Sequence, residues 1–315
     1  MQSRFGLLTV LTFVIVLVCT FTRVKAAEIS CLETWPKALP ATNTKAPELL
    51  KRSFPSGFSP LGFCKAAGLA GKIAKGDFET FKKLFQKNFR ALELVYLNSP
   101  GGDVDEAMAI GRLMRRYLVS AKAPIYSSDG DNYLIGPWLG LDTATTNYVC
   151  SGLTCICASA CALVWFGSPE RSGSAGLHRP VFSDPAFSRL PAADASKVYS
   201  QALSRVGAYL REMEAPQNLV ESMIATDSST IRWVEATEDK LTEPPSIAEW
   251  INSSCGSFIE DDETARMKLQ IKEQFGGGLT AAEDASLKLL YKRSAYRRNC
   301  AAMLKRRNVD ALSAP

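Results

Sequence analysis

The sequence has little of three things: histidine, net charge and long apolar runs. Only one of its 315 residues is a histidine, His178, so a histidine-dependent enzyme would have a single candidate base. The formal net charge is +5, and three of the positive charges, Arg4, Arg23 and Lys25, lie in the first 26 residues. Without those three, 34 of the 37 Lys and Arg residues face 32 Asp and Glu residues. This balance gives the chain no overall electrostatic footprint for nucleic-acid binding.

Only one segment is long and apolar enough to approach the length of a membrane span, and it lies at the N-terminus. A basic start at Arg4 precedes a mostly apolar run from Phe5 to about Phe21, and small residues follow before Ala27. This pattern is typical of a secretory signal peptide, cleaved here near Ala26. Because a run of about 17 residues is at the lower edge of spanning length, an uncleaved anchor stays open as the alternative. We therefore expect a periplasmic or secreted protein, membrane-anchored if the segment is retained.

The cysteine pattern agrees with export. Cys19 leaves with the signal, and an even number remains, which in an exported chain predicts disulfides. The sequence does not give their connectivity. The spacing of the four central cysteines (x4, x1, x3) fits no common zinc pattern, so we expect neither a metal nor another cofactor. The disulfide candidates are Cys31, Cys64, Cys150, Cys155, Cys157, Cys161, Cys255 and Cys300.

The chain divides into four parts by composition and pattern. The second part is rich in Pro, Ser, Thr and Lys and predicts an irregular lead-in, and the fourth is polar and helical. The third predicts one α/β domain. The parts are a signal peptide or anchor at 1–26, the lead-in at 27–64, the α/β domain at 65–250 and the helical C-terminal extension at 251–315.

The clearest local pattern is a strand, a glycine turn and a helix. "ALELVYLN" predicts a buried strand, "SPGG" ends it abruptly, and "VDEAMAIGRLMRRYLV" predicts a helix with Ala107, Ile110, Met114 and Tyr117 on one side. This order is the βα unit of an α/β fold. Residues 122–148 carry turn residues without a clear period, which indicates a long loop or a weak hairpin.

The C-terminal extension carries a basic cluster. Residues 262–308 predict two polar helices separated by glycines at 276–278, and the second contains "YKRSAYRRNCAAMLKRR". A solvated helix face is the ordinary explanation of such a cluster. Peripheral association with a membrane, or with an acidic partner, is the alternative.

Three elements of the sequence can build one catalytic site. Gly101 and Gly102 end a buried strand just before a helix, where backbone N–H groups lack intrahelical partners and can donate to an oxyanion. Ser159, between small residues at the start of an apolar helix, is either an N-cap or a nucleophile, with the Ala160 N–H as a second oxyanion donor. His178 supplies the base that a serine nucleophile needs at neutral pH.

These three elements, in this order, resemble one family. "LNSPGGDVDEAMAI", "CASACALVWFG" and "GLHRP" are similar to motifs of the ClpP-type serine peptidases of the ClpP/crotonase superfamily, in particular an exported branch with cysteines around the serine. The resemblance covers roughly residues 65–250. It implies a spiral of β-β-α units, with Ser159 as nucleophile, His178 as base, and the glycine turn with Ala160 as oxyanion hole.

The sequence departs from the family pattern at the third member of a triad. Where the family places an aspartate, "STIRWVEATED" has Ile231. Asp227, four residues earlier, can orient the imidazole through Nδ1. A Ser–His dyad oriented by a backbone carbonyl and an inactive site are the alternatives that stay open.

Two cysteines lie two residues either side of the serine. Cys157 and Cys161 occupy positions i and i+4 of a helix start, where a mutual bridge is strained. Disulfides to each other or to Cys150 and Cys155 would rigidify the serine's turn; the strain favours outward pairing, and the mutual bridge stays open as the alternative.

The leading functional prediction is an exported serine peptidase acting on peptides or unfolded protein. The alternative is a catalytically inactive scaffold or peptide-binding protein of the cell envelope with the same fold. A crotonase-like thioester enzyme would have no use for the Ser–His pair, and coenzyme A is not expected outside the cytosol. The resemblance implies a homo-oligomer, and export implies that no ATP-driven unfoldase takes part.

Overall fold

A five-stranded, mostly parallel sheet forms the centre of the protein. The computed structural model describes residues 26–35, 58–136, 148–181, 187–237, 241–256, 260–276 and 278–315. Strand order is β1-β2-β3-β4-β7; β1 is antiparallel to β2, and the other neighbours are parallel. The strands are β1 (Glu28–Thr34), β2 (Cys64–Ala70), β3 (Leu94–Asn98), β4 (Ser120–Lys122) and β7 (Arg171–Ser172). A mixed α/β fold with parallel strands is therefore confirmed.

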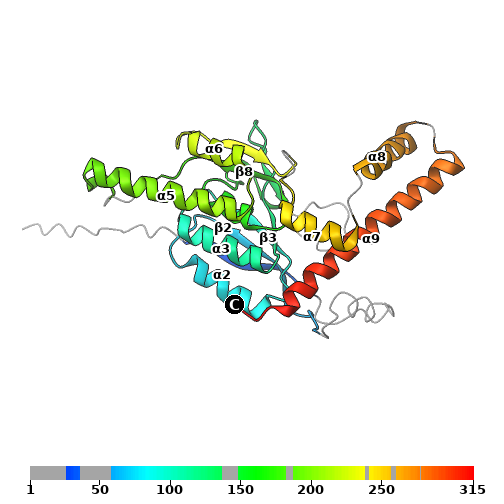
Figure 1. The fold of residues 1–315 in the computed structure, drawn as a ribbon, viewed down its shortest axis with the longest axis horizontal. Helices are drawn as coiled ribbons and strands as arrows, with labels where there is room; N and C mark the ends of the chain where they lie inside the picture. The colour runs from blue at the N-terminus through cyan, green and yellow to red at the C-terminus, as the bar shows by residue number, and fades with distance from the viewer. Residues whose placement is uncertain are drawn as a thin grey trace, which may run out of the picture.

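Helices α2 (Asp77–Asn88) and α3 (Val104–Arg116) connect successive parallel strands and lie together on the sheet (Figure 1). Their apolar positions recur at helical spacing, so one face of each helix is buried against the strands. On α3 and its C-cap, the four side chains expected on one side are all buried, as the periodicity predicts. They are Ala107, Ile110, Met114 and Tyr117.

A second set of elements comprises a buried helix, two short two-stranded sheets and two further helices. Helix α4 (Ala160–Gly167) is buried along its whole length. Strand β8 (Ser174–Leu177) pairs with β9 (Arg232–Glu235), and helices α5 (Ala192–Glu212) and α6 (Gln217–Ala225) lie between them in sequence. Within the segment expected to be a loop or weak hairpin, β5 (Tyr133–Ile135) pairs with β6 (Tyr148–Ser151); residues 137–147 between them lie outside the described residues. A 3-10 turn, η1 (Phe187–Arg189), precedes α5.

The lead-in is not irregular throughout, contrary to the prediction from its composition. Residues 28–34 form β1, which extends the sheet beside β2 and is joined to it by a Cys31–Cys64 disulfide. Ala27 is buried, and its N–H donates to Asp77 Oδ2 at 3.1 Å. The remainder of the lead-in, residues 36–57, and the expected signal segment up to residue 25 lie outside the described residues.

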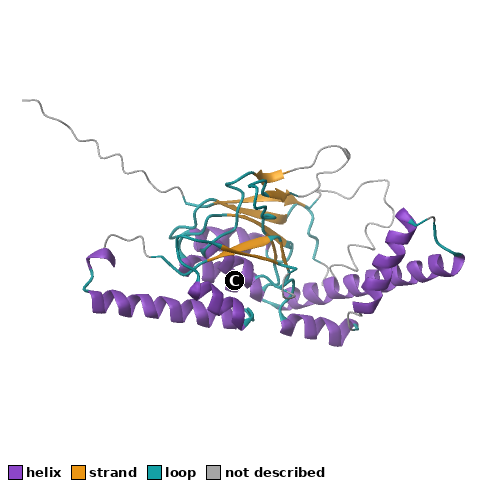
Figure 2. Cartoon of the chain, turned by 90° about the horizontal axis from the view of Figure 1, so that it is seen from above, coloured by secondary structure: helices purple, strands orange, loops and turns teal. Residues whose placement is uncertain are grey.

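The C-terminal extension contains α7 (Pro245–Cys255), α8 (Glu260–Phe275) and α9 (Ala281–Ala311), so the two predicted polar helices are present. Helix α9 runs down the molecule until the chain end lies beside α2 (Figure 1). There Tyr117 Oη donates to Ser313 O at 2.6 Å, and Gln86 Nε2 donates to Pro315 O at 2.7 Å. The N-terminal part of α9 packs against α8, and these two helices project from the body as an arm (Figure 2). No helix in the described part of the chain is long and apolar enough to cross a membrane.

Candidate active site

The glycine turn links β3 to α3 and is fixed by hydrogen bonds at both ends. Asp103 caps α3, its carboxylate accepting from the N–H groups of Asp105 and Glu106 at 2.9 and 3.0 Å. The buried Ser99 accepts from Gly101 N–H at 3.1 Å. Gly101 and Gly102 have φ values of 99° and 139°, a region that L side chains rarely adopt.

Each glycine also makes an approach that a Cβ would prevent. A Cβ on Gly101 would lie 2.6 Å from Ser159 Cβ and 2.8 Å from Ala160 N. A Cβ on Gly102 would lie 2.0 Å from Ile73 O. The absence of a side chain at Gly101 therefore allows the glycine turn to lie directly against the Ser159 turn, and its absence at Gly102 allows the turn to lie against the Ile73 backbone.

Ser159 lies in a sharp turn immediately before α4. Its φ of 58° and ψ of −125° are rare for a residue with a side chain. It occupies the N-cap position, yet its side chain makes no cap hydrogen bond. Two backbone contacts hold the turn: Ser159 N–H donates to Gly176 O at 2.8 Å, and Ala158 N–H donates to Ser99 O at 3.0 Å. Within the described part of the chain, the Ser159 hydroxyl makes no hydrogen bond, so it is not committed to capping the helix.

Two backbone N–H groups, those of Ala160 and Gly102, remain available as oxyanion donors. Ala160 is the first residue of α4, so its N–H has no intrahelical acceptor. Neither it nor the Gly102 N–H donates to any residue that the structure describes. Gly101, also expected to donate, does not fit that role, because Ser99 Oγ already accepts its N–H. Its contribution is the close approach to Ser159.

His178 follows β8 directly, two residues after the Gly176 carbonyl that binds Ser159. Its Nδ1 lies 2.8 Å from Arg179 O. Since a carbonyl oxygen can only accept, Nδ1 of the neutral ring carries the proton and Nε2 is left as the proton acceptor. The ring is partly exposed. In the described structure, His178 and Ser159 are not hydrogen-bonded to each other.

Asp227 does not orient the imidazole, contrary to one of the sequence predictions. Its carboxylate pairs with the Arg179 guanidinium and accepts from Ser229 N–H at 2.9 Å and Ser229 Oγ at 2.8 Å. The hydrogen bonds from Ser229, together with Arg179, lower the pKa of this exposed carboxyl. The Arg179 carbonyl accepts from Nδ1 instead, as the alternative of an imidazole oriented by a backbone carbonyl predicts.

All eight candidate cysteines are paired, but not all as expected. Cys157 pairs with Cys161 across the serine, so the expectation that both pair outward is wrong; Cys150 and Cys155 pair with each other beside the β5–β6 hairpin. A β-bridge anchors Cys157 to Ser99, and Cys161 lies in the first turn of α4. The two ends of the Ser159 turn are therefore covalently joined, which the outward pairing would not have achieved. The other bridges are Cys31–Cys64 and Cys255–Cys300.

Sequence reasoning missed four residues that build the site. Ser99 and Ile73 hold the glycine turn, since Ile73 N–H donates to Gly101 O at 2.8 Å and Ile73 O accepts from Asp103 N–H at 2.9 Å. Gly176 and Arg179 act through their backbone carbonyls. The "SPGG" motif already contained a signal for Ser99, whereas backbone carbonyls leave no residue-type signal.

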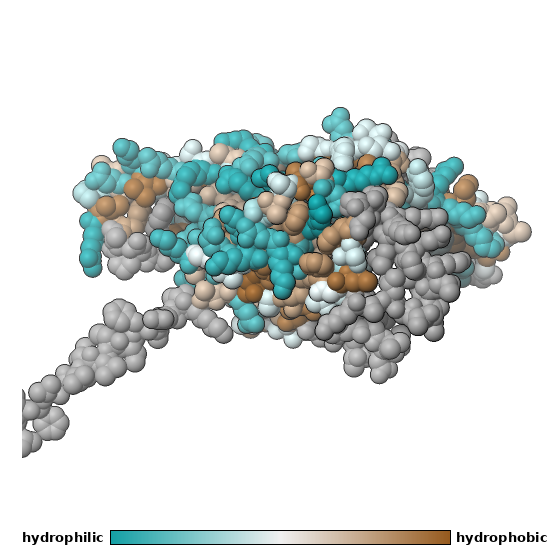
Figure 3. All heavy atoms as spheres, turned by 90° about the horizontal axis from the view of Figure 1, so that it is seen from below, coloured by the Kyte–Doolittle hydropathy of each residue, from teal (hydrophilic) through white to brown (hydrophobic). Residues whose placement is uncertain are grey.

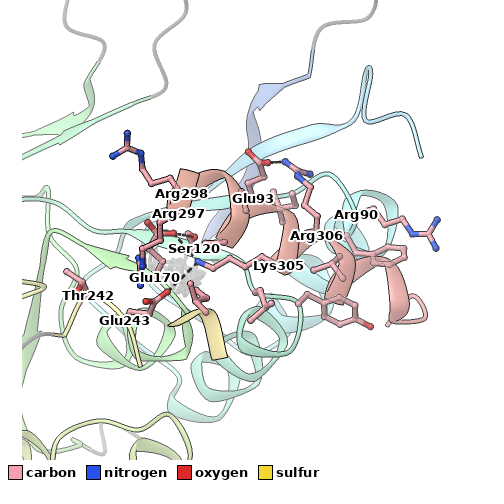
Figure 4. A pocket seen from close by; sticks show the side chains of 18 residues that line it. Arg90, Glu93, Ser120, Glu170, Thr242, Glu243, Arg297, Arg298, Lys305 and Arg306 are labelled. Carbon is pink, nitrogen blue, oxygen red and sulfur yellow. Dashed lines mark hydrogen bonds and ion pairs between the residues drawn. The ribbon is translucent and has the colours of Figure 1, made fainter. Parts of the chain in front are cut away.

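A separate cavity of about 520 Å³ lies between α9 and the opposite ends of the sheet strands (Figure 4). Its charged side chains are largely paired with each other. Lys305 reaches between Glu170 and Glu243, at 3.3 and 3.8 Å, and Arg306 pairs with Glu93. These pairs tie α9 to the body of the protein, and Glu170 also accepts from Ser120 Oγ at 3.3 Å.

The comparisons with known proteins yield one kind of match. A scan against protein-family models finds no matching family, and a search of curated proteins finds no matching protein. Among solved structures, the chain is similar to a single-residue variant of ClpP1 from Listeria monocytogenes, with a TM-score of 0.38 and 13% sequence identity. The match covers 57% of this chain and 87% of the ClpP1 chain.

Proposed function

We propose that this protein is an exported serine peptidase of ClpP-like fold that acts through a Ser159 acyl-enzyme. The single observation that carries the proposal is the Ser159 turn: a positive-φ serine with an unbound hydroxyl, held against a glycine turn that leaves the N–H groups of Gly102 and Ala160 available. Neither the positive φ nor the unbound hydroxyl is needed for a serine that only caps a helix.

The chemistry follows from these atoms. His178 Nε2 takes the proton of Ser159 Oγ as the oxygen attacks the substrate carbonyl, and the N–H groups of Gly102 and Ala160 stabilise the oxyanion. The imidazolium then gives its proton to the departing amine, leaving the acyl-enzyme. Water attacks the ester with Nε2 again as base, and Ser159 recovers its proton. The Ser159–His178 hydrogen bond forms when substrate binds, since catalytic contacts often tighten only in the complex.

We also propose the setting in which this chemistry operates. Export, as predicted from the N-terminal segment and supported by four disulfides, places the protein where ATP is scarce. Its substrates are then short peptides or unfolded protein, delivered without an unfoldase. Self-association is part of the proposal, and sedimentation of the purified protein tests it: a monomer at micromolar concentration contradicts self-association.

A non-catalytic peptide-binding or scaffold protein of the cell envelope is the second candidate. The observations that favour it are the missing Ser159–His178 hydrogen bond and the engagement of Asp227 with Arg179. Under this alternative, the free N–H groups of Gly102 and Ala160 would bind a peptide carbonyl without cleaving the chain.

A peptide-cleavage assay separates the two candidates. We expect the oxidised protein to cleave unstructured fluorogenic peptides, Ser159→Ala to abolish cleavage, and Ser253→Ala, a control serine in α7, to leave it intact. Cleavage that persists in Ser159→Ala would contradict the proposal. Peptide binding without cleavage by the wild type would establish the second candidate.

A further inference from the structure

Most of helix α9 carries charge of one sign only. Between residues 285 and 308 it has eight basic residues and no acidic residue. The peptidase site uses none of them, and the charge balance of the whole chain hides them. The eight are Lys288, Lys292, Arg293, Arg297, Arg298, Lys305, Arg306 and Arg307.

Some of these cations have partners inside the molecule. Lys305 pairs with Glu170 and Glu243, and Arg306 pairs with Glu93. Their positions along the cavity explain why the inner face of α9 is basic: it docks on an acidic part of the body (Figure 4). The same explanation does not extend to the outer face.

The outer face combines cations with apolar side chains. Leu289, Lys292, Tyr296, Met303 and Arg307 are spaced by three, four, seven and four residues, which puts them on one side of the helix. All five are exposed, and Tyr296 and Leu289 expose 68% and 50% of their surface. Lys292 and Arg307 have no carboxylate partner among the residues that the structure describes. This strip therefore presents cationic and apolar groups side by side to the outside of the molecule.

The shape of the strip indicates what kind of counterpart fits. From Leu289 to Arg307 it is about 27 Å long at 1.5 Å per residue, one helix wide and convex. The arm that carries its upper half projects from the body, and brown apolar side chains lie among teal polar ones at that end of the molecule (Figure 3). Phe275, at the end of α8 where the arm turns, is 83% exposed. A convex strip that mixes cations with aromatic and aliphatic groups fits a broad anionic interface rather than a pocket.

We propose that the outer strip of α9 docks the protein peripherally on an anionic phospholipid surface. The cations attract the headgroups, while Tyr296, Leu289 and Met303 enter the interfacial layer. The docking does not depend on the peptidase activity. It would hold the Ser159 site close to a membrane and enrich substrates released from that membrane.

Vesicle sedimentation of the full chain tests the proposal. Wild type, Lys292→Gln/Arg307→Gln and Leu289→Gln/Tyr296→Gln are compared on vesicles of phosphatidylglycerol mixed with phosphatidylcholine and on pure phosphatidylcholine. The matched control is Lys83→Gln/Lys87→Gln, which removes two exposed cations from α2. Mass spectrometry confirms that all variants share one N-terminus, so the apolar N-terminal run contributes equally.

We expect preferential binding to the anionic vesicles, weakened by salt. Loss of two cations near the surface should weaken binding roughly thirtyfold, and the apolar variant should also bind less, while the α2 control should match wild type. Equal binding of wild type to both vesicle types would overturn the proposal, as would undiminished binding of the α9 charge variant. The proposal would also be overturned if the α8–α9 arm formed a dimer, or a complex with an acidic protein, instead of binding vesicles. Circular dichroism and an intact Cys255–Cys300 bridge confirm folding of each variant.

Discussion

Among single residues, the proposed activity depends most on one strained serine, Ser159. A non-glycine residue at φ 58° costs on the order of 1–3 kcal/mol and persists only where surrounding contacts impose it. Here Gly176 and Ser99 impose it through the backbone, and the Cys157–Cys161 bridge joins the two ends of the turn. The strain is explained if the hydroxyl must be exposed beside the N–H groups of Gly102 and Ala160.

Gly101→Ala tests how closely the two turns must approach. The added Cβ would lie 2.6 Å from Ser159 Cβ and would push the serine turn away from the glycine turn. We expect reaction of Ser159 with an active-site probe to fall by at least about 100-fold, because a small displacement of catalytic groups can cost that much.

Gly62→Ala is the matched control for that substitution. Gly62 also has a positive φ, 78°, but its Cβ would meet nothing within 4 Å. Both variants carry the backbone strain of about 1 kcal/mol or more, so thermal unfolding should shift in both, while only Gly101→Ala should lose reactivity. Equal reactivity in the two variants would contradict the assigned role of Gly101.

Asp227→Asn tests what orients the imidazole. In a Ser–His–Asp triad this change lowers kcat roughly 10⁴-fold. Because Nδ1 here binds Arg179 O at 2.8 Å, we expect the variant to retain activity within about tenfold of wild type. The measurement is kcat on the same peptide. A decrease in kcat as large as that in a triad would show that Asp227 orients the imidazole.

Among the structural elements, two disulfides should differ in their main effect. We expect one to matter more for the reactivity of Ser159 and the other to matter more for the free energy of unfolding. Bridge Cys157–Cys161 closes only 4 residues, whereas Cys255–Cys300 closes 45. Chain entropy predicts losses of about 2 and about 4 kcal/mol, respectively, when each is removed. The first bridge spans the nucleophile, and the second joins α7 to α9.

Paired alanine variants make that contrast measurable. Cys157→Ala/Cys161→Ala should lose most probe reactivity with the smaller decrease in unfolding free energy. Cys255→Ala/Cys300→Ala should show the larger decrease while the reactivity of the folded protein persists. Denaturant unfolding and probe labelling rates measure the two effects. The reverse order of labelling rates would show that the short bridge does not position the serine.

The sequence predicts those elements whose cause is local. The periodicity of α3, the strand "ALELVYLN" and the glycine turn are all confirmed, because apolar spacing and glycine conformation act over a few residues. Strand β1 was missed because its short alternating run lies beside a Pro-rich and Lys-rich segment. The Cys157–Cys161 pairing and the Arg179 carbonyl beside His178 depend on backbone positions that residue types do not encode.

At the scale of the whole molecule, α9 fastens the C-terminal extension to the body. Its contact surface includes Glu243, whose pKa is raised mainly by burial, against the opposing effect of Lys305. Helix α9 thus packs against a carboxyl group that resists ionisation. The free energy of unfolding should therefore depend on pH through Glu243.

Glu243→Gln makes that dependence visible. A raised pKa means that the folded protein binds the proton more tightly than the unfolded chain, so this contribution to stability is complete below the usual value of 4.5 and is lost as pH rises through the raised value. We therefore expect the variant to gain stability relative to wild type as pH increases from 4 to 7. Urea unfolding across that range measures it; a constant difference would contradict the burial of a charged carboxyl beneath α9.

The central claim is that Ser159 is an activated nucleophile with His178 as its base. Fluorophosphonate labelling of the oxidised protein, with the adduct located by mass spectrometry, tests it most directly. The account predicts an adduct on Ser159 in wild type and none in Ser159→Ala, with severely slowed labelling in His178→Ala. A folded, fully bridged wild type that stays unlabelled, or is labelled equally with and without His178, would contradict it.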